Sequence, residues 1–243
     1  MIAVKNYTLQ VGDFRLQDVT MDIKDGEIFA ILGQTGSGKT VLLESMAGFY
    51  EEFSGGILYD GRPVHSIPLQ DRRLGFVYQD FGLFPHMKVR ANIEYGLRIK
   101  GMKRAACEEK SRNMMELLGI CHLADRYPGT LSGGEQQRIA LARAILKDAP
   151  IVVLDEATAF ADPENEHQIQ KAFEILTRNK TVLMIAHRLS TVQNADNIIV
   201  LSEGKIAEQG SHSALLERNG VYAAMWADYQ RSAQWKVGKE AAV

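Results

Sequence analysis

The sequence predicts an α/β fold with a mainly parallel sheet, on three observations. Four short runs of apolar, strand-favouring residues recur along the chain, at 28–32, 151–154, 182–186 and 198–201. Each of the first three is followed by a loop and then by a helical pattern, which is typical of strand–helix–strand units. The runs are continuously apolar, which indicates strands buried on both faces, as in a parallel sheet.

The segment that precedes residue 28 follows a different pattern. Between Phe14 and Ile23, apolar residues such as Leu16, Val19 and Met21 alternate with polar ones. This is the period of a strand with one buried face. We therefore expect an N-terminal antiparallel β region that leads into the first buried strand.

Residues 91–123 have the apolar spacing of helices, and Gly101 interrupts the pattern. Because this block breaks the strand–helix alternation, we expect it to belong to an inserted helical subdomain. The residues from 227 onward are polar and rich in alanine, and we expect either a terminal helix or an irregular end.

Composition narrows the class of protein. Of the 243 residues, 46% are hydrophobic and 24% charged, and the net charge is -2, values that exclude disordered chains and strongly basic nucleic-acid binders. Cys107 and Cys121 have no paired spacing, so we expect two reduced thiols. The longest stretch without Asp, Glu, Lys or Arg, 28–38, is shorter than the ~20 residues of a membrane span, and we read no signal peptide. We expect a cytoplasmic chain.

Residues 33–40 read Gly-Gln-Thr-Gly-Ser-Gly-Lys-Thr, between the first buried strand and a helical pattern. Glycines let successive N–H groups point at one phosphate, and the following helix adds its N-terminal dipole. Lys39 is expected to reach the β- and γ-phosphates, and Thr40 to place its hydroxyl on Mg²⁺. The alternative is a glycine-rich turn with a chance lysine. The motif predicts a nucleoside triphosphate bound by Gly33, Gln34, Thr35, Gly36, Ser37, Gly38, Lys39, Thr40 and Val41.

Two carboxylates follow the strand at 151–154, namely Asp155 and Glu156. They are expected at the carboxyl edge of a parallel sheet, where ligands bind. We expect Asp155 to hold Mg²⁺ and Glu156 to orient and polarise the attacking water. An ordinary solvated strand end would also carry such residues, but the phosphate loop upstream favours the functional interpretation.

A second candidate anion site lies between these motifs, where residues 131–138 read Leu-Ser-Gly-Gly-Glu-Gln-Gln-Arg. Ser132 can cap the helix that follows, and Gly133 and Gly134 leave its first N–H groups accessible. An ordinary serine-capped helix is the alternative. A head-to-tail dimer explains two phosphate sites in one chain, because each nucleotide would then lie between the Lys39 loop of one copy and the Ser132 loop of the other.

The run at 131–138 resembles the signature of ATP-binding cassette (ABC) ATPases, and the other motifs follow in that family's order over nearly the whole chain. The resemblance implies a P-loop NTPase fold with ATP and Mg²⁺ as ligands. It implies that Gln79 contacts Mg²⁺ and the attacking water, and that His187 contacts the γ-phosphate. The expected catalytic residues are Glu156, His187, Gln79 and Lys39; the expected Mg²⁺ ligands are Thr40, Gln79 and Asp155; and the signature contacts to the partner's nucleotide come from Ser132, Gly133, Gly134 and Gln136.

The resemblance also implies an organisation. Residues 1–243 would form one ABC ATPase domain, with a nucleotide-binding core at 1–80 and 135–226, a helical subdomain at 81–134 and a tail at 227–243. Two copies would dimerise on ATP. The helical subdomain would dock a transmembrane transporter subunit, which places the chain at the cytoplasmic face of the membrane.

The sequence departs from the family pattern in two ways. The aromatic residue expected to stack on adenine is missing near Gln10 and Val11, with Tyr7 and Phe14 as the flanking substitutes. In addition, residues 78–87 read Tyr-Gln-Asp-Phe-Gly-Leu-Phe-Pro-His-Met, and on this run residues 1 to about 140 resemble molybdate/tungstate-type importer ATPases. Residues 155–158 read Asp-Glu-Ala-Thr and 186–191 read Ala-His-Arg-Leu-Ser-Thr, and on these runs residues from about 150 to 243 resemble exporter-type, siderophore-linked cassettes. We formulate the hypothesis of a mosaic or engineered chimera joined near 140–150.

Two other functions compete with a transport ATPase. One is a non-transport ABC ATPase that acts on nucleic acid, which the charge balance and the single cassette disfavour. The other is a catalytically weak nucleotide-binding scaffold, which only an activity assay separates from the enzyme.

Overall fold

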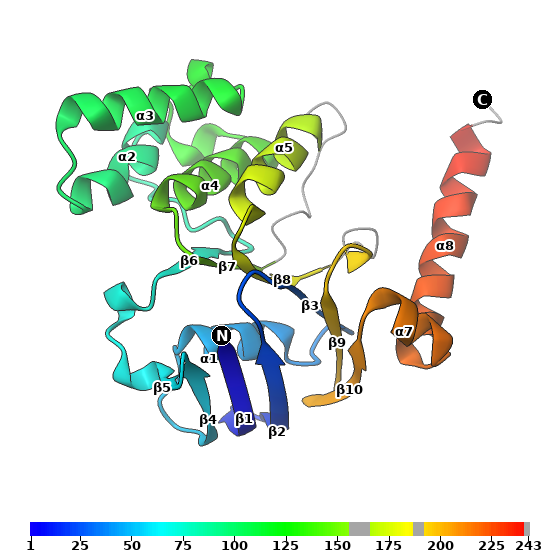
Figure 1. Ribbon diagram of the computed structural model, residues 1–243. Helices are drawn as coiled ribbons and strands as arrows, with labels where there is room; N and C mark the ends of the chain where they lie inside the picture. Colours follow the sequence, from blue (N-terminus) through cyan, green and yellow to red (C-terminus); the bar gives the residue numbers. More distant parts are fainter. Residues whose placement is uncertain (156–165, 187–191, 241–243) are drawn as a thin grey trace. The chain divides into compact units, whose positions relative to one another are not determined.

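The computed structural model describes residues 1–155, 166–186 and 192–240 (Figure 1). They form two units, and each is described by itself. Unit 1 comprises Met1–Arg72 and Leu183–Val243, and unit 2 comprises Arg73–Val182. In the described part of the chain, no helix is both long and apolar enough to cross a membrane.

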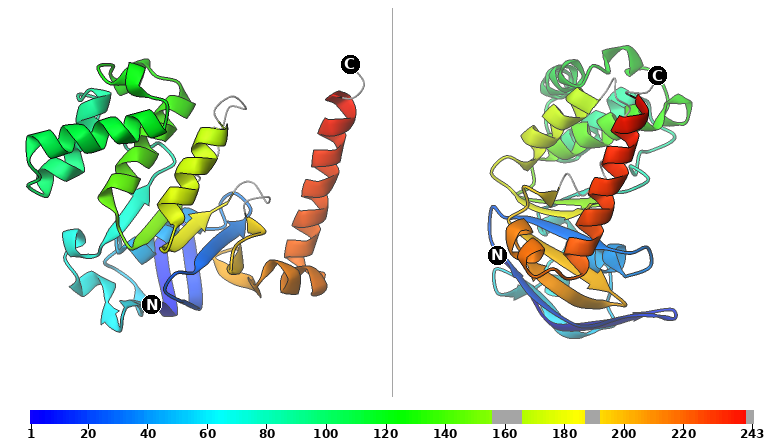
Figure 2. Two further views of the ribbon diagram at one scale, coloured as in Figure 1. Left: turned by 45° about the horizontal axis from the view of Figure 1, so that its top comes forward. Right: turned by 90° about the vertical axis from the view of Figure 1, so that its right-hand side faces the viewer.

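Unit 1 contains the expected antiparallel sheet, with strand order β2-β1-β4-β5 (Figure 1). Figure 2 shows its N-terminal strands, in blue, from two further sides. Ile2 of β1 pairs with Ile23 of β2 on one side and with Tyr59 of β4 on the other. The first two strands form the β region that the sequence predicted. β4 was missed because Gly55 and Gly56 obscure its pattern, and β5 has only two residues. The strands are β1 (Ile2–Val11), β2 (Phe14–Ile23), β4 (Ser54–Tyr59) and β5 (Arg62–Pro63).

A second sheet of unit 1 has the order β10-β9-β3-β8, to which β8 contributes its residues from Leu183 onward. β3 runs parallel to β9, with Phe29 opposite Asn197, and β10 is antiparallel to β9. The four predicted apolar strands are all present in the chain, and β10 was not predicted. The elements are β3 (Ile28–Gly33), β8 (Thr181–Ile185), β9 (Asn197–Ser202) and β10 (Lys205–Gly210).

The helices of unit 1 are α1 (Lys39–Ala47), α7 (His212–Glu217) and α8 (Val221–Glu240), with short 3-10 turns at Val64–Ser66 and Leu69–Asp71. Of the two alternatives expected for the residues from 227 onward, a terminal helix or an irregular end, the structure has the helix, and it begins before residue 227. The Glu208 carboxylate accepts the backbone N–H groups of Val221 and Tyr222. It thereby satisfies two amides that a helix start leaves open.

The described residues of unit 2 contain the parallel pair β6 (Leu74–Val77) and β7 (Ile151–Asp155) together with several α-helices. The helical stretch expected at 91–123 forms two helices, and the interruption expected at Gly101 lies between them, where this residue adopts a left-handed φ of 75°. The predicted limits 81–134 for a helical subdomain stay a prediction. The helices are α2 (Val89–Ile99), α3 (Arg104–Leu117), α4 (Gly133–Lys147) and α5 (Glu166–Thr177), with 3-10 turns at Cys121–Leu123 and Pro128–Thr130.

Candidate active site

The phosphate loop of unit 1 connects the end of β3 to the start of α1, and glycine is required at both of its ends. Gly33 has a φ of 150°, and Gly38 has a φ of 97°. A Cβ on Gly33 would overlap the carbonyl oxygen of Leu201, and one on Gly38 would overlap the ring of Phe14. The shape of the loop and its close packing therefore both require glycine, which has no side chain.

The start of α1 is open toward an anion. Within the described chain, no side chain caps this end by a hydrogen bond, and its first turn holds no acidic residue. The Lys39 ammonium crosses the loop, where it donates to the carbonyls of Gly33 at 3.0 Å and Gln34 at 2.9 Å. Only 9% of Lys39 is exposed. The dipole of α1, the amide groups of the loop and the Lys39 ammonium together form a site with positive electrostatic potential.

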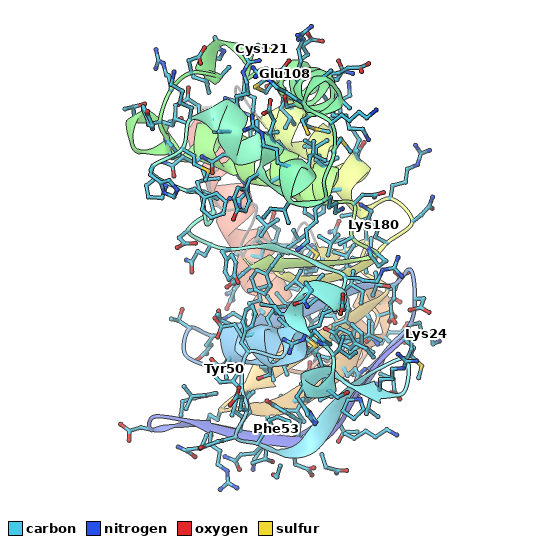
Figure 3. The ribbon with its side chains drawn as sticks, turned by 90° about the vertical axis from the view of Figure 1, so that its left-hand side faces the viewer. Lys24, Tyr50, Phe53, Glu108, Cys121 and Lys180 are labelled. Atoms are coloured by element: carbon cyan, nitrogen blue, oxygen red, sulfur yellow. The ribbon has the colours of Figure 1, made fainter. Side chains whose placement is uncertain are left out.

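The two aromatic substitutes for an adenine-stacking residue differ in accessibility. Tyr7 is 1% exposed, and its ring lies 5.2 Å from that of Phe53, which Figure 3 labels. Tyr7 is therefore a core residue, and its role as a base-stacking substitute was a wrong alternative. Phe14 is half-buried and lies against Gly38, so it packs on the phosphate loop itself.

In unit 2, Tyr78, Gln79, Asp80 and Asp155 line an open pocket of about 400 Å³. The pocket follows from strand register: β6 and β7 run parallel with Val77 opposite Leu154, so their carboxyl ends coincide. Asp155 is 4% exposed. Thus two predicted site residues meet in one pocket. Tyr78 and Asp80 were not predicted as site residues, although both flank Gln79 just after the same strand.

Two side chains of unit 2 hold the segment that follows Gln79. The Asn92 amide, which is fully buried, accepts from the Phe84 N–H at 2.8 Å and donates to the carbonyls of Phe84 and Met87. The Arg143 guanidinium donates to the Gly82 carbonyl and lies 4.7 Å over the Phe84 ring. Burial lowers the pKa of Arg143. α2 and α4 thereby fix the backbone beside the pocket, and sequence reasoning missed both residues.

The signature segment forms the helix start that was expected of it. The Ser132 hydroxyl accepts from the Glu135 N–H at 3.3 Å, and the Glu135 carboxylate accepts from the Ser132 N–H at 2.7 Å. This reciprocal pair is a capping box. Ser132 is exposed. The Gln136 amide donates to the carbonyls of Pro128 and Leu131, so its amino group stabilises the preceding turn; its nucleotide contact stays a prediction.

Glu156 and His187 lie outside the described residues, immediately after β7 and shortly after β8. Their predicted roles therefore stay predictions. In the ranges that the structure describes, no cluster of three or more His, Cys, Asp or Glu side chains is suited to hold a metal ion by itself. Cys107 is buried and Cys121 exposed, and both are free thiols.

Comparison with known proteins places the fold and the motifs in context. The family model described as ABC transporter matches residues 16–159. An ATP-dependent lipid A-core flippase of Ralstonia nicotianae is 42% identical over 227 residues, which cover 88% of this chain and 38% of the relative. A mycobactin import ATP-binding/permease protein of Mycolicibacterium thermoresistibile is 42% identical over 219 residues, 87% of this chain and 24% of the relative. The chain thus spans well under half the length of these relatives.

Solved structures with the same fold include a bacterial Atm1-family ABC exporter with ATP bound, with a TM-score of 0.81 and 33% identity over 93% of this chain and 41% of that chain. A dimeric ATP-binding cassette in a post-hydrolysis state with ADP and Pi has a TM-score of 0.77 and 28% identity over 87% of this chain and 98% of that chain. The flippase alignment is long enough to run through residues 140–150, so the comparisons give the mosaic hypothesis no support.

Proposed function

Because the chain belongs to the ABC transporter family and is an ATPase domain of that type, we propose that it hydrolyses ATP with Mg²⁺ as a head-to-tail dimer. In this proposal the dimer energises transport through a membrane-spanning subunit or domain. The transported substrate and the direction of transport are left open.

The phosphate loop carries the proposal. The loop has a backbone shape that requires glycine and contains the buried Lys39 ammonium, and among the described residues no side chain caps the start of α1 by a hydrogen bond. The negative charge of a triphosphate complements the positive potential of this site. Lys39 would offset charge that develops on the transferred phosphoryl group, and this kind of charge placement supplies most of the catalysis in such enzymes.

The carboxylate pocket fits the metal that the proposal requires. Asp155 is a buried carboxylate, and the Gln79 amide lines the same pocket. Carboxylate, amide and hydroxyl oxygens are the donors that Mg²⁺ prefers, so Asp155, Gln79 and Thr40 would hold it. When bound, Mg²⁺ neutralises charge on the phosphates. Glu156 would accept a proton from the attacking water or orient it, and His187 would contact the γ-phosphate.

The signature loop supports the dimer. Ser132 is exposed at the start of α4, and the capping box orders that helix start. A second copy would bring this loop to the nucleotide. The helical segment 81–134 would contact the membrane-spanning partner, and the chain would work at the cytoplasmic face of the membrane.

The test is the ATPase rate of the purified chain with Mg²⁺-ATP, compared with Glu156→Gln and Lys39→Ala variants. We expect Glu156→Gln to lower turnover by about 10²-fold or more while ATP binding persists. Lys39→Ala should lower both binding and turnover. An unchanged rate in Glu156→Gln would refute the assigned role of that carboxylate, and a wild-type chain without activity would favour the scaffold interpretation.

A further inference from the structure

The C-terminal end of α1 is held by two side chains from elsewhere in unit 1. The Tyr59 hydroxyl donates to the Met46 carbonyl, and the Arg72 guanidinium donates through Nη1 to the carbonyls of Ala47 at 2.8 Å and Gly48 at 2.9 Å. α1 has no basic residue in its own last turn. Arg72 therefore supplies the cation that complements the negative end of the helix dipole.

The surroundings of Arg72 are shaped for its guanidinium. Nε donates to the Ile67 carbonyl at 2.9 Å, so the planar group contacts three carbonyls at once. Gly48 has a left-handed φ of 77°, and a Cβ there would lie 2.7 Å from Nη1 of Arg72. A lysine would provide a single point of charge in place of this fork.

The position of Arg72 in the chain distinguishes it from Tyr59. Arg73 follows it with a left-handed φ of 54°, and β6 (Leu74–Val77) comes next. This strand leads directly to Gln79 in the carboxylate pocket. Tyr59 lies on β4, which continues into β5. Of these two residues, only Arg72 both caps the phosphate-loop helix and begins the segment that carries Gln79.

We propose that Arg72 is a positioning residue that ties the phosphate-loop helix to the strand leading to Gln79, so that Gln79 is placed correctly for hydrolysis. The proposal rests on the proposed ATPase function. It predicts that Arg72 influences turnover through Gln79 rather than through ATP binding or helix stability alone.

The experiment is a double-mutant cycle of Arg72→Gln and Gln79→Ala, read as kcat and as the Kd of a fluorescent ATP analogue. We expect Arg72→Gln to lower kcat about 10-fold, the order of effect that displaced catalytic groups produce, with Kd changed less than about 2-fold. In the Gln79→Ala background, Arg72→Gln should lower kcat by no more than about 2-fold, because both changes disable one coupled unit.

Two controls separate positioning from stability. Tyr59→Phe removes a hydrogen bond from the same end of α1; burial raises the pKa of Tyr59, which keeps this donor protonated. It should lower Tm while kcat stays within about 2-fold of wild type. Arg73→Gln removes the same charge from the adjacent, exposed residue and should change neither quantity.

Additive effects on kcat in the cycle, or equal losses of kcat in Arg72→Gln and Tyr59→Phe, would overturn the positioning role. An inactive wild-type chain would instead refute the proposed function, which keeps the two failures distinct.

Discussion

The phosphate loop and the carboxylate pocket are built in different ways. The loop is made of consecutive residues, and its shape depends on backbone that only Gly33 and Gly38 allow. The pocket instead combines Gln79 and Asp155, which are distant in sequence and meet because β6 and β7 are in register. A local motif therefore encodes the first region, and tertiary pairing creates the second. Substitutions should damage the two in different ways.

The largest expected effect tests the backbone-built region. In Gly38→Ala, the new Cβ would overlap the Phe14 ring at a residue with left-handed φ. We expect ATP binding to be lost and stability to fall by about 2–5 kcal/mol, measured by ligand titration and urea unfolding. Gly56→Ala is the control, since its Cβ would meet nothing within 4 Å. Normal ATP binding by Gly38→Ala would contradict the account.

The next effect tests the side-chain-built region. Asp155→Asn keeps the shape of the pocket but removes its buried carboxylate charge. We expect turnover to fall about 10²-fold, with a higher Mg²⁺ requirement and ATP binding largely retained. The matched variant Asp80→Asn alters an exposed carboxylate of the same pocket and should change turnover by less than about 3-fold. Equal losses in the two variants would remove the special role of Asp155.

A smaller effect concerns the signature helix. Ser132→Ala deletes the hydroxyl that accepts the Glu135 N–H, which should cost about 1 kcal/mol of unfolding free energy. Ser211 caps α7 in the same way by accepting the Ala214 N–H. Ser211→Ala should therefore cost a similar amount in urea unfolding but leave the ATPase rate unchanged, whereas Ser132→Ala should lower both. Equal rates in the two variants would reduce Ser132 to a helix cap.

The smallest effect comes from an ion pair just before β7 and β8. Lys180 lies 2.9 Å from Asp148, whose side chain is 81% exposed, and it lowers the pKa of Asp148 below 3.8. The pair therefore stabilises the fold above that pH, and this contribution disappears as pH falls through the lowered pKa. Lys180→Gln should cost less than about 1 kcal/mol at pH 7 in urea unfolding. A loss that stays unchanged as the pH falls through the lowered pKa would point to packing instead.

The sequence was most informative where structure is local. Continuous apolar runs predicted β3, β7, β8 and β9, and alternation from Phe14 to Ile23 predicted the antiparallel β region to which β1 and β2 belong. β4 begins with Ser54, Gly55 and Gly56, residues without strand preference, and forms because β1 pairs with it. Likewise, the early start of α8 depends on the Glu208 carboxylate, which belongs to another element.

The candidate site follows the same division. Motif spacing predicted the phosphate loop and the Ser132 cap, since both depend on neighbouring residues. The position of Asp155 at a strand end made it a candidate, and the family resemblance did the same for Gln79. The hydrogen bonds of Asn92 and Arg143 that hold the segment beside the pocket were missed, because they come from helices distant in sequence. The burial of Tyr7 was missed as well, and the ring that it contacts, Phe53, is also distant in sequence.

The central claim is that each active site combines the phosphate loop of one copy with the signature loop of another. Mixing two defective variants tests it most directly. Lys39→Ala lacks a working phosphate loop, and Ser132→Arg blocks the signature loop. Each variant alone should be nearly inactive, but a mixed dimer contains one site in which both loops are intact. The account predicts that mixing restores a substantial part of the wild-type ATPase rate. A mixture as inactive as its components, beside an active wild-type chain, would contradict it.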